Sequence, residues 1–218
     1  MSEIVVRPAR GIGVIAAVDG TAKAGLVAML AVAVAAPELG NMADKAAGLR
    51  AIAYPMLAFA LPAAWYGMWR ERASFPWVAD LLLTLTCFTD ILGNRLDLYD
   101  RVWWFDDCMH LVNVALLAAA WMLLTMDASA RLAARLERSL ALGMTAAVWW
   151  EIAEYAAFVS GSSERSTAYE DTLGDLAMGC VGAVLAAYVL HRLASRGRLD
   201  AVVPLRSRPA GERTAQLV

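Results

Sequence analysis

The chain has 218 residues, of which 60% are hydrophobic and 18% are charged, and its mean hydropathy is +0.53. A soluble domain of this length does not need so apolar a composition, so the sequence predicts an all-α, polytopic membrane protein. The net charge of -2 and the absence of a basic stripe exclude nucleic acid as a partner. The three cysteines have no Cys-x-x-Cys spacing, so neither a disulfide framework nor a zinc ribbon is predicted.

Six apolar stretches approach the roughly 20 residues that a helix needs to cross a bilayer. They are residues 22–37, 50–69, 77–93, 108–126, 139–159 and 173–193. We therefore expect a six-helix transmembrane domain over 22–193, between a cytoplasmic N-terminal segment, 1–21, and a disordered cytoplasmic tail, 194–218. The first stretch is short, and Lys23 at its start with Ala33-Val34-Ala35 near its end also fits a cleaved signal sequence.

The distribution of positive charge predicts the orientation, because cytoplasmic segments retain Lys and Arg during insertion. With the N-terminus inside, thirteen of these residues fall in cytoplasmic segments and five in outer segments. Both termini are therefore expected in the cytoplasm. Residues 128–138 place Leu132 and Leu136 on one face and arginines on the other, which is typical of a short interfacial helix.

Three polar fragments interrupt the apolar pattern, one in each of the last three stretches or at its start. Within each fragment the ionisable side chains are spaced i, i+3 or i, i+4 and so share a helix face. With about 1.5 Å of rise per residue, the three sets are expected to meet at one depth in the outer half of the bundle. The candidate site residues are Asp106, His110, Glu151, Glu154, Asp171 and Asp175.

Two interpretations apply to these acids. Asp106 or Asp107, and Asp171, stand where N-caps of their helices are expected, and an N-cap needs no further function. Glu151 and Glu154 lie inside an apolar run, where an ionised side chain costs about 2.5 to 3.5 kcal/mol near the bilayer centre. No Lys or Arg is expected at matching depth, so the sequence leaves a bound cation, shared protons or a water-filled cavity.

A metal ion bound here would have carboxylates and one imidazole as donors. That set suits Mg, Mn, Fe, Ca or Zn and disfavours copper or an iron–sulfur cluster, so a divalent metal ion is the candidate cofactor. Asp90 is expected either beside the site or at the membrane interface, and Asp80 at the interface. Gly179, Gly182 and Ala183 predict that another helix approaches the last one closely.

The same fragments resemble the YjdF-like bacterial inner-membrane family. The resemblance rests on Phe105-Asp106 with His110, on Glu151-Ile152-Ala153-Glu154-Tyr155, and on Asp171-Thr172-Leu173-Gly174-Asp175 followed by Gly182-Ala183. Tyr169-Glu170 stands where the family has a tryptophan before the first Asp, and Tyr155 stands where Trp is common. The resemblance implies a multi-span fold in the bacterial inner membrane and brings no established activity.

Three functional hypotheses follow. The first is a metal-dependent membrane enzyme that acts near the outer face on a lipid or another amphipathic substrate. The second is a cation- or proton-coupled carrier, which predicts polar helices that continue to the inner face. The third is a non-catalytic membrane scaffold. No nucleophile motif, Gly-rich phosphate loop or paired Arg clamp narrows the reaction class or assigns catalytic residues.

Overall fold

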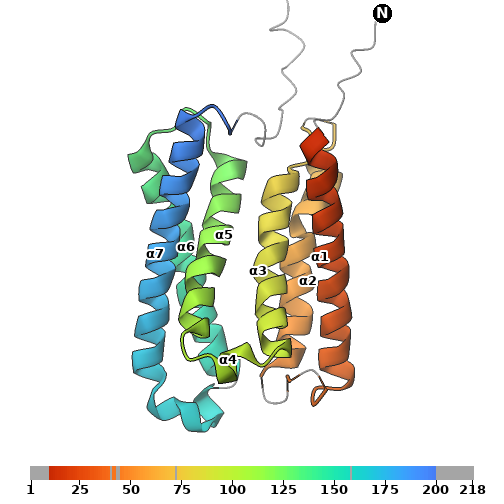
Figure 1. Cartoon of the computed structure of the whole chain (residues 1–218), viewed down its shortest axis with the longest axis vertical. Coiled ribbons are helices and arrows are strands. Elements are labelled where there is room, and N and C mark those ends of the chain that lie inside the picture. Colours follow the sequence, from red (N-terminus) through yellow and green to blue (C-terminus); the bar gives the residue numbers. More distant parts are fainter. Residues whose placement is uncertain (1–9, 40, 43–44, 72, 158, 200–218) are drawn as a thin grey trace, which may run out of the picture.

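The computed structural model describes residues 10–199 except 40, 43–44, 72 and 158. Within this part of the chain, six α-helices of 18 residues or more run side by side (Figure 1). They are α1 Arg10–Ala35, α2 Ala47–Ala64, α3 Trp77–Arg95, α5 Phe105–Thr125, α6 Leu132–Ala157 and α7 Ala168–Ser195. The short helices are a π-helical turn at Trp65–Trp69, α4 Leu98–Arg101, and 3-10 turns at Val159–Gly161 and Ser163–Ser166. These residues contain no strand, which confirms the all-α prediction.

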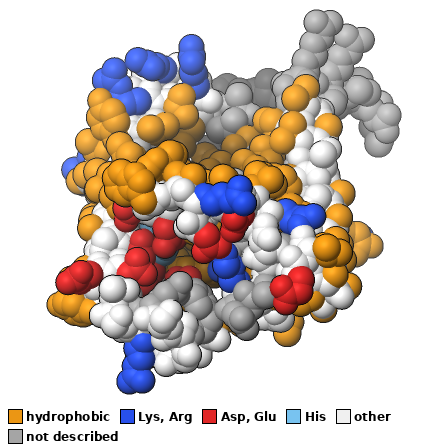
Figure 2. Space-filling view, turned by 60° about the horizontal axis from the view of Figure 1, so that its bottom comes forward, with side chains coloured by type: hydrophobic (Ala, Val, Ile, Leu, Met, Phe, Trp, Pro, Cys, Tyr) orange, Lys and Arg blue, Asp and Glu red, His pale blue; other side chains and the backbone are white. Residues whose placement is uncertain are grey.

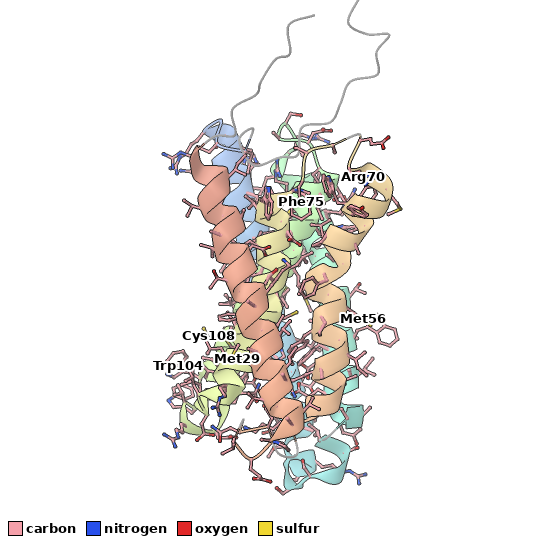
Figure 3. The ribbon with its side chains drawn as sticks, turned by 90° about the vertical axis from the view of Figure 1, so that its right-hand side faces the viewer. Met29, Met56, Arg70, Phe75, Trp104 and Cys108 are labelled. Carbon is pink, nitrogen blue, oxygen red and sulfur yellow. The ribbon has the colours of Figure 1, made fainter. Side chains whose placement is uncertain are left out.

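The bundle has two halves. Helices α1 to α3 pack together, α5 to α7 pack together, and α3 packs on α5 to join them (Figure 1). Helix α1 begins and α7 ends at one end of the bundle, called the terminal end here; α4 lies at the opposite, distal end. Figure 3 shows Arg70 and Phe75 toward the terminal end and Trp104 toward the distal end.

Four of the long helices are apolar enough to cross a membrane. They are Ile12–Ala35, Ala47–Trp69, Phe105–Thr125 and Ala168–Ser195. Large apolar side chains such as Met56, which points outward in Figure 3, cover much of their outer surface, as lipid contact requires. Helices α3 and α6 are also long enough, at about 28 and 39 Å, but charged and hydroxyl side chains lower their hydropathy.

The first helix begins earlier than the apolar pattern indicates. It starts at Arg10 rather than near residue 22 and includes Asp19, because Lys23 neutralises that carboxylate inside the bundle. The Lys23 Nζ lies 2.7 Å from Asp19 Oδ1, 2.8 Å from Asp80 Oδ2 and 2.6 Å from Thr84 Oγ1. This network ties α1 to α3. Residues 1–9 and 200–218 of the two expected terminal segments lie outside the described residues.

Asp80 belongs to this network and is buried between helices. The residue is 1% exposed, and its Oδ1 has no hydrogen-bond partner. Asp80 lies in the first turn of α3, near the beginning of the third apolar stretch. Its partner Lys23 is 57 residues earlier in the chain, so no local pattern indicates the pair.

The predicted interfacial helix at 128–138 is also wrong. Helix α6 begins at Leu132 and continues without a break to Ala157. Arg135 is 1% exposed, and its guanidinium donates hydrogen bonds to the backbone carbonyls of Asp127, Ala128 and Ala130 at 2.9 to 3.3 Å. The arginine thus joins the start of α6 to the turn that precedes it.

Helix α7 packs closely on α5 and α6, as its small residues predict. A Cβ at Gly182 would collide with the carbonyl oxygen of Leu111, and Ser139 Oγ donates a hydrogen bond of 2.6 Å to the carbonyl of Ala183. Leu111 follows His110 in α5, so this close approach of α5 and α7 lies beside the histidine in the chain. Toward the terminal end, an apolar core built largely on α5 and α7 closes the bundle.

Candidate metal centre

A cavity of about 490 Å³ lies at the distal end, between α2, α3, α5, α6 and the start of α7. Figure 2 shows acidic side chains gathered around a hollow at this end, with basic side chains beside them. The lining includes five of the six predicted site residues, Asp106, His110, Glu151, Glu154 and Asp171. The sixth, Asp175, contacts His110 from α7.

His110 stands at the centre of the cluster and is 8% exposed. Its Nε2 lies 3.5 Å from Asp106 Oδ1 and 3.6 Å from Asp175 Oδ1. Its Nδ1 lies 3.5 Å from Glu151 Oε1. Both imidazole nitrogens therefore face carboxylates, and these come from three different helices, α5, α6 and α7.

These separations are long for hydrogen bonds between nitrogen and oxygen. Each separation matches the spacing of two ligands on one ion, because two donors that each lie about 2.1 Å from a tetrahedral metal are about 3.4 Å apart. The two ring nitrogens point in different directions, so each could serve a different ion together with the carboxylates that face it. Two triads have one ligand atom from each residue within 4.8 Å of the others. One triad is Asp106, His110 and Asp175, and the other is His110, Glu151 and Glu154.

Glu151 gives an independent indication of a ligand. The residue is 9% exposed; its Oε2 accepts a hydrogen bond of 3.0 Å from Thr172 Oγ1, while its Oε1 is buried with no hydrogen-bond partner. A buried carboxylate oxygen without a partner is costly. Carboxylates and a neutral imidazole are suitable donors for hard and borderline divalent ions, so the residues present fit such a metal.

The N-cap interpretation of the aspartates is wrong. Helix α5 follows Trp104 and α7 follows Thr167, and neither boundary has a side-chain cap hydrogen bond. Asp106 is the second residue of α5 and Asp171 the fourth of α7, so both carboxylates lie within the first turns, where the helix dipole favours them. Asp171 lines the cavity but belongs to neither triad.

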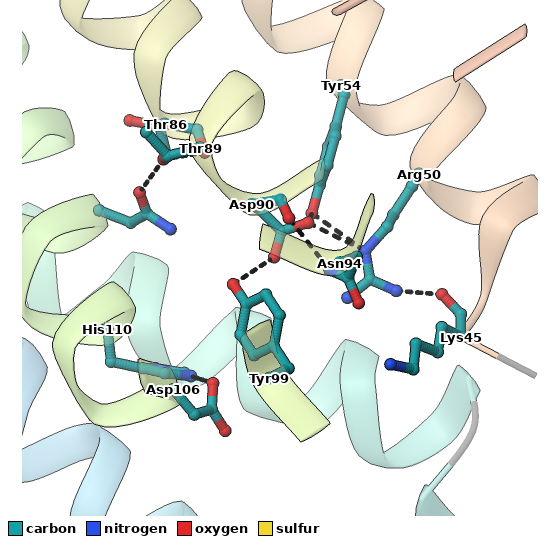
Figure 4. A network of polar contacts seen from close by, with 11 residues as sticks. Lys45, Arg50, Tyr54, Thr86, Thr89, Asp90, Asn94, Tyr99, Asp106 and His110 are labelled. Carbon is teal, nitrogen blue, oxygen red and sulfur yellow. Dashed lines mark hydrogen bonds and ion pairs between the residues drawn. The ribbon is translucent and has the colours of Figure 1, made fainter. Parts of the chain in front are cut away.

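A second network forms the opposite wall of the cavity (Figure 4). Arg50 Nε lies 3.1 Å from Asp90 Oδ2, and the hydroxyls of Tyr54 and Tyr99 donate to the same carboxylate at 2.5 and 3.0 Å. The Arg50 guanidinium also donates to the carbonyl oxygen of Lys45. Asp90 is 6% exposed, so of its two expected positions the one beside the site is correct.

The expectation that no cation lies beside the acids is therefore wrong. Arg50 is 7% exposed and lines the same cavity as Glu151 and Glu154. Because Arg50 opens the second apolar stretch, the charge count assigns it to an outer segment. Its partner Asp90 is 40 residues away, so no spacing rule links the two. Thr172, also missed, lies between the two aspartates of its fragment.

Comparison with known proteins places this architecture in a family. Residues 21–196 match the family described as "predicted membrane protein (DUF2238)". The chain belongs to the DUF2238 family. The match agrees with the resemblance to the YjdF-like family. No curated protein and no solved structure matches the chain.

The DUF2238 match contains every residue of the two triads and both residues of the Arg50–Asp90 pair. It also contains Lys23 and Asp80, although Asp19, the other acid of their network, precedes the matched segment. The family description gives membrane location and no activity. The function of this DUF2238 protein must therefore be inferred from the chemistry of its cavity.

Proposed function

We propose that this protein is a metal-dependent membrane enzyme that acts on a lipid or another amphipathic substrate. A divalent ion would be held by one nitrogen of His110 and the carboxylates that face it, either between α5 and α7 or between α5 and α6. The observation that carries the proposal is the imidazole of His110, which has carboxylates at 3.5 to 3.6 Å from both of its nitrogens. The Oε1 of Glu151, which is buried without a hydrogen bond, supports it.

The charge balance of the cavity also favours a cation. Its two basic side chains already have partners, because Arg50 pairs with Asp90 and Lys45 with Asp100. Among the described residues, no Lys or Arg lies within ion-pair distance of the three carboxylates that face His110, which belong to Asp106, Glu151 and Asp175. Ionised acids inside a membrane each cost a few kcal/mol, and a divalent ion offsets that cost.

When bound, the metal would supply a Lewis acid to an oxygen of the substrate. The chain's own groups would position the substrate and move protons. Glu154 lines the cavity and is only partly buried. One of its carboxylate oxygens belongs to a triad, and we assign the other oxygen to proton exchange with the substrate. Tyr54 and Tyr99, held by Asp90, would shape the opposite wall.

We further propose six membrane crossings with both termini in the cytoplasm. Helix α1 begins and α7 ends at the same end of the bundle (Figure 1), which an even number of crossings requires. Lys and Arg are concentrated in the segments assigned to the terminal end. The cavity would then open toward the outer face of the bacterial inner membrane.

A carrier is the second candidate. It is favoured by a second group of buried charges away from the cavity, formed by Lys23 and Asp19 of α1 and Asp80 of α3. Polar groups toward both ends of a bundle are what an ion path needs. The apolar core of α5 and α7 opposes this function, because Ala118 and Ala187 are fully buried within it. Close packing at these described residues leaves little space for water between α5 and α7.

The test uses the purified protein in vesicles made from a bacterial total lipid extract, supplied with Mg, Mn or Zn. We expect a metal-dependent change in the lipids, detected by mass spectrometry, and a 10²- to 10⁴-fold slower reaction for Glu154→Gln, the usual effect of losing an acid–base group. Glu170→Gln, an exposed acid on α7, is the matched control. Metal or proton flux without lipid conversion would support the carrier and contradict the enzyme; a folded protein with neither activity would support the scaffold.

A further inference from the structure

A second hollow, of about 270 Å³, runs between α2 and α6. Its walls are almost entirely apolar and are built mainly from Leu49, Ala53, Ala146, Trp149, Ala153 and Ala157. Leu49 and Trp149 are 48% and 66% exposed, so the groove is open at the side of the bundle. A membrane around the protein would bring lipid chains, not water, to this opening.

The groove arises because α2 and α6 belong to different halves of the bundle. Helix α2 packs on α1 and α3, while α6 packs on α5 and α7. Alanines face each other across the gap, and these short side chains leave it unfilled. At the α5–α7 contact small residues instead bring the backbones together, as Gly182 and Leu111 show. Small residues therefore have opposite effects at the two interfaces.

The inner end of the groove joins the polar cavity. Arg50, Tyr54, Trp150 and Glu154 line both hollows. Tyr54 and Trp150 stack with ring centroids 6.2 Å apart, and the Arg50 guanidinium lies 5.6 Å from the Trp150 ring. A molecule that extends from the groove into the cavity would thus pass from apolar walls to the charged side chains of Arg50 and Glu154.

We propose that this groove holds one hydrocarbon chain of a membrane lipid whose polar head lies in the cavity beside Glu154. The inference rests on the proposed function and names its substrate class as a lipid that enters sideways from the bilayer. The apolar walls favour a hydrocarbon chain, because a hydrocarbon in the groove makes dispersion contacts that an empty groove lacks. The charged inner end of the groove favours the polar head of a lipid, because buried charges are stabilised by polar partners.

The experiment uses a phospholipid with a photoactivatable diazirine in one acyl chain, mixed into vesicles that contain the full-length protein. After irradiation, we expect saturable cross-links on the α2 and α6 residues that line the groove. Ala153→Phe, which fills the groove from α6, should reduce these cross-links at least several-fold, and Ala53→Phe should do the same from α2. Ala141→Phe, at an exposed alanine of α6 outside both hollows, should leave them unchanged.

Metal content measured on the same samples separates this inference from the proposed function. Localised cross-links without bound metal would retain the lipid groove and overturn the metal-dependent enzyme. Bound metal with cross-links spread evenly over all lipid-facing helices would overturn the groove and leave the metal centre standing. Localised cross-links that neither phenylalanine variant reduces would also overturn the groove, because the chain would then lie elsewhere on α2 and α6.

Discussion

Replacing His110 by alanine is expected to abolish divalent-metal binding. The imidazole is common to both triads, so its removal deprives each of a ligand. Loss of a group that merely orients a metal ligand typically weakens affinity about 10- to 100-fold, and loss of a ligand itself should exceed that range. The measurement is a competition titration between the detergent-solubilised protein and a metal-sensitive chelating dye.

His191→Ala is the matched control for this substitution. His191 is the other histidine of the chain and lies on α7 toward the terminal end, away from both triads. We expect His191→Ala to bind metal with wild-type affinity. Wild-type affinity in a folded His110→Ala protein would show that the imidazole only forms ion pairs with the surrounding acids, and it would contradict the proposed ligand role.

Replacing Lys23 by methionine is expected to lower the free energy of unfolding by about 3 to 5 kcal/mol, the usual cost of removing one partner from a buried ion pair. The substitution would leave Asp19 and Asp80 facing each other inside the bundle without a cation. Unfolding by a denaturing detergent, followed by circular dichroism, measures the change.

Two further variants separate lost charge compensation from lost packing. Lys45→Met removes a cation whose partner Asp100 is more than half exposed, and an exposed pair contributes about 0 to 1 kcal/mol. Adding Asp19→Asn and Asp80→Asn to Lys23→Met should recover most of the lost stability, because the uncompensated charges are gone. A triple variant as unstable as Lys23→Met would contradict an electrostatic origin.

The sequence predicts the carboxylate–histidine cluster because the relevant information is local. Spacings of three and four residues place Asp106 with His110, and Glu151 with Glu154, on single helix faces whatever the tertiary structure. The lengths of the apolar stretches then predict that the three fragments lie at one depth. In the structure, His110 Nε2 lies 3.6 Å from Asp175 Oδ1. The close approach of α7 to its neighbouring helices is likewise predicted by Gly179 and Gly182.

The interhelical ion pairs could not be predicted, because they join residues far apart in the chain. Hydropathy treats Lys23 and Arg50 as interruptions of apolar runs, whereas in the bundle each is neutralised by a carboxylate of α3. The same limitation affects Arg135, whose burial depends on the turn before α6. Local sequence patterns locate the charged residues, but they do not identify the distant partners that stabilise those charges inside the bundle.

The central claim, a metal centre between α5, α6 and α7, is tested most directly by elemental mass spectrometry of the purified protein after metal repletion. The wild type should contain one or two equivalents of a divalent metal, and the Glu151→Gln, Glu154→Gln variant should lose metal while remaining folded. A control pair at exposed acids of the same and the neighbouring helix, Glu137→Gln with Glu170→Gln, should keep the wild-type content. A wild-type protein without metal after repletion, or equal metal in both double variants, would contradict the metal centre.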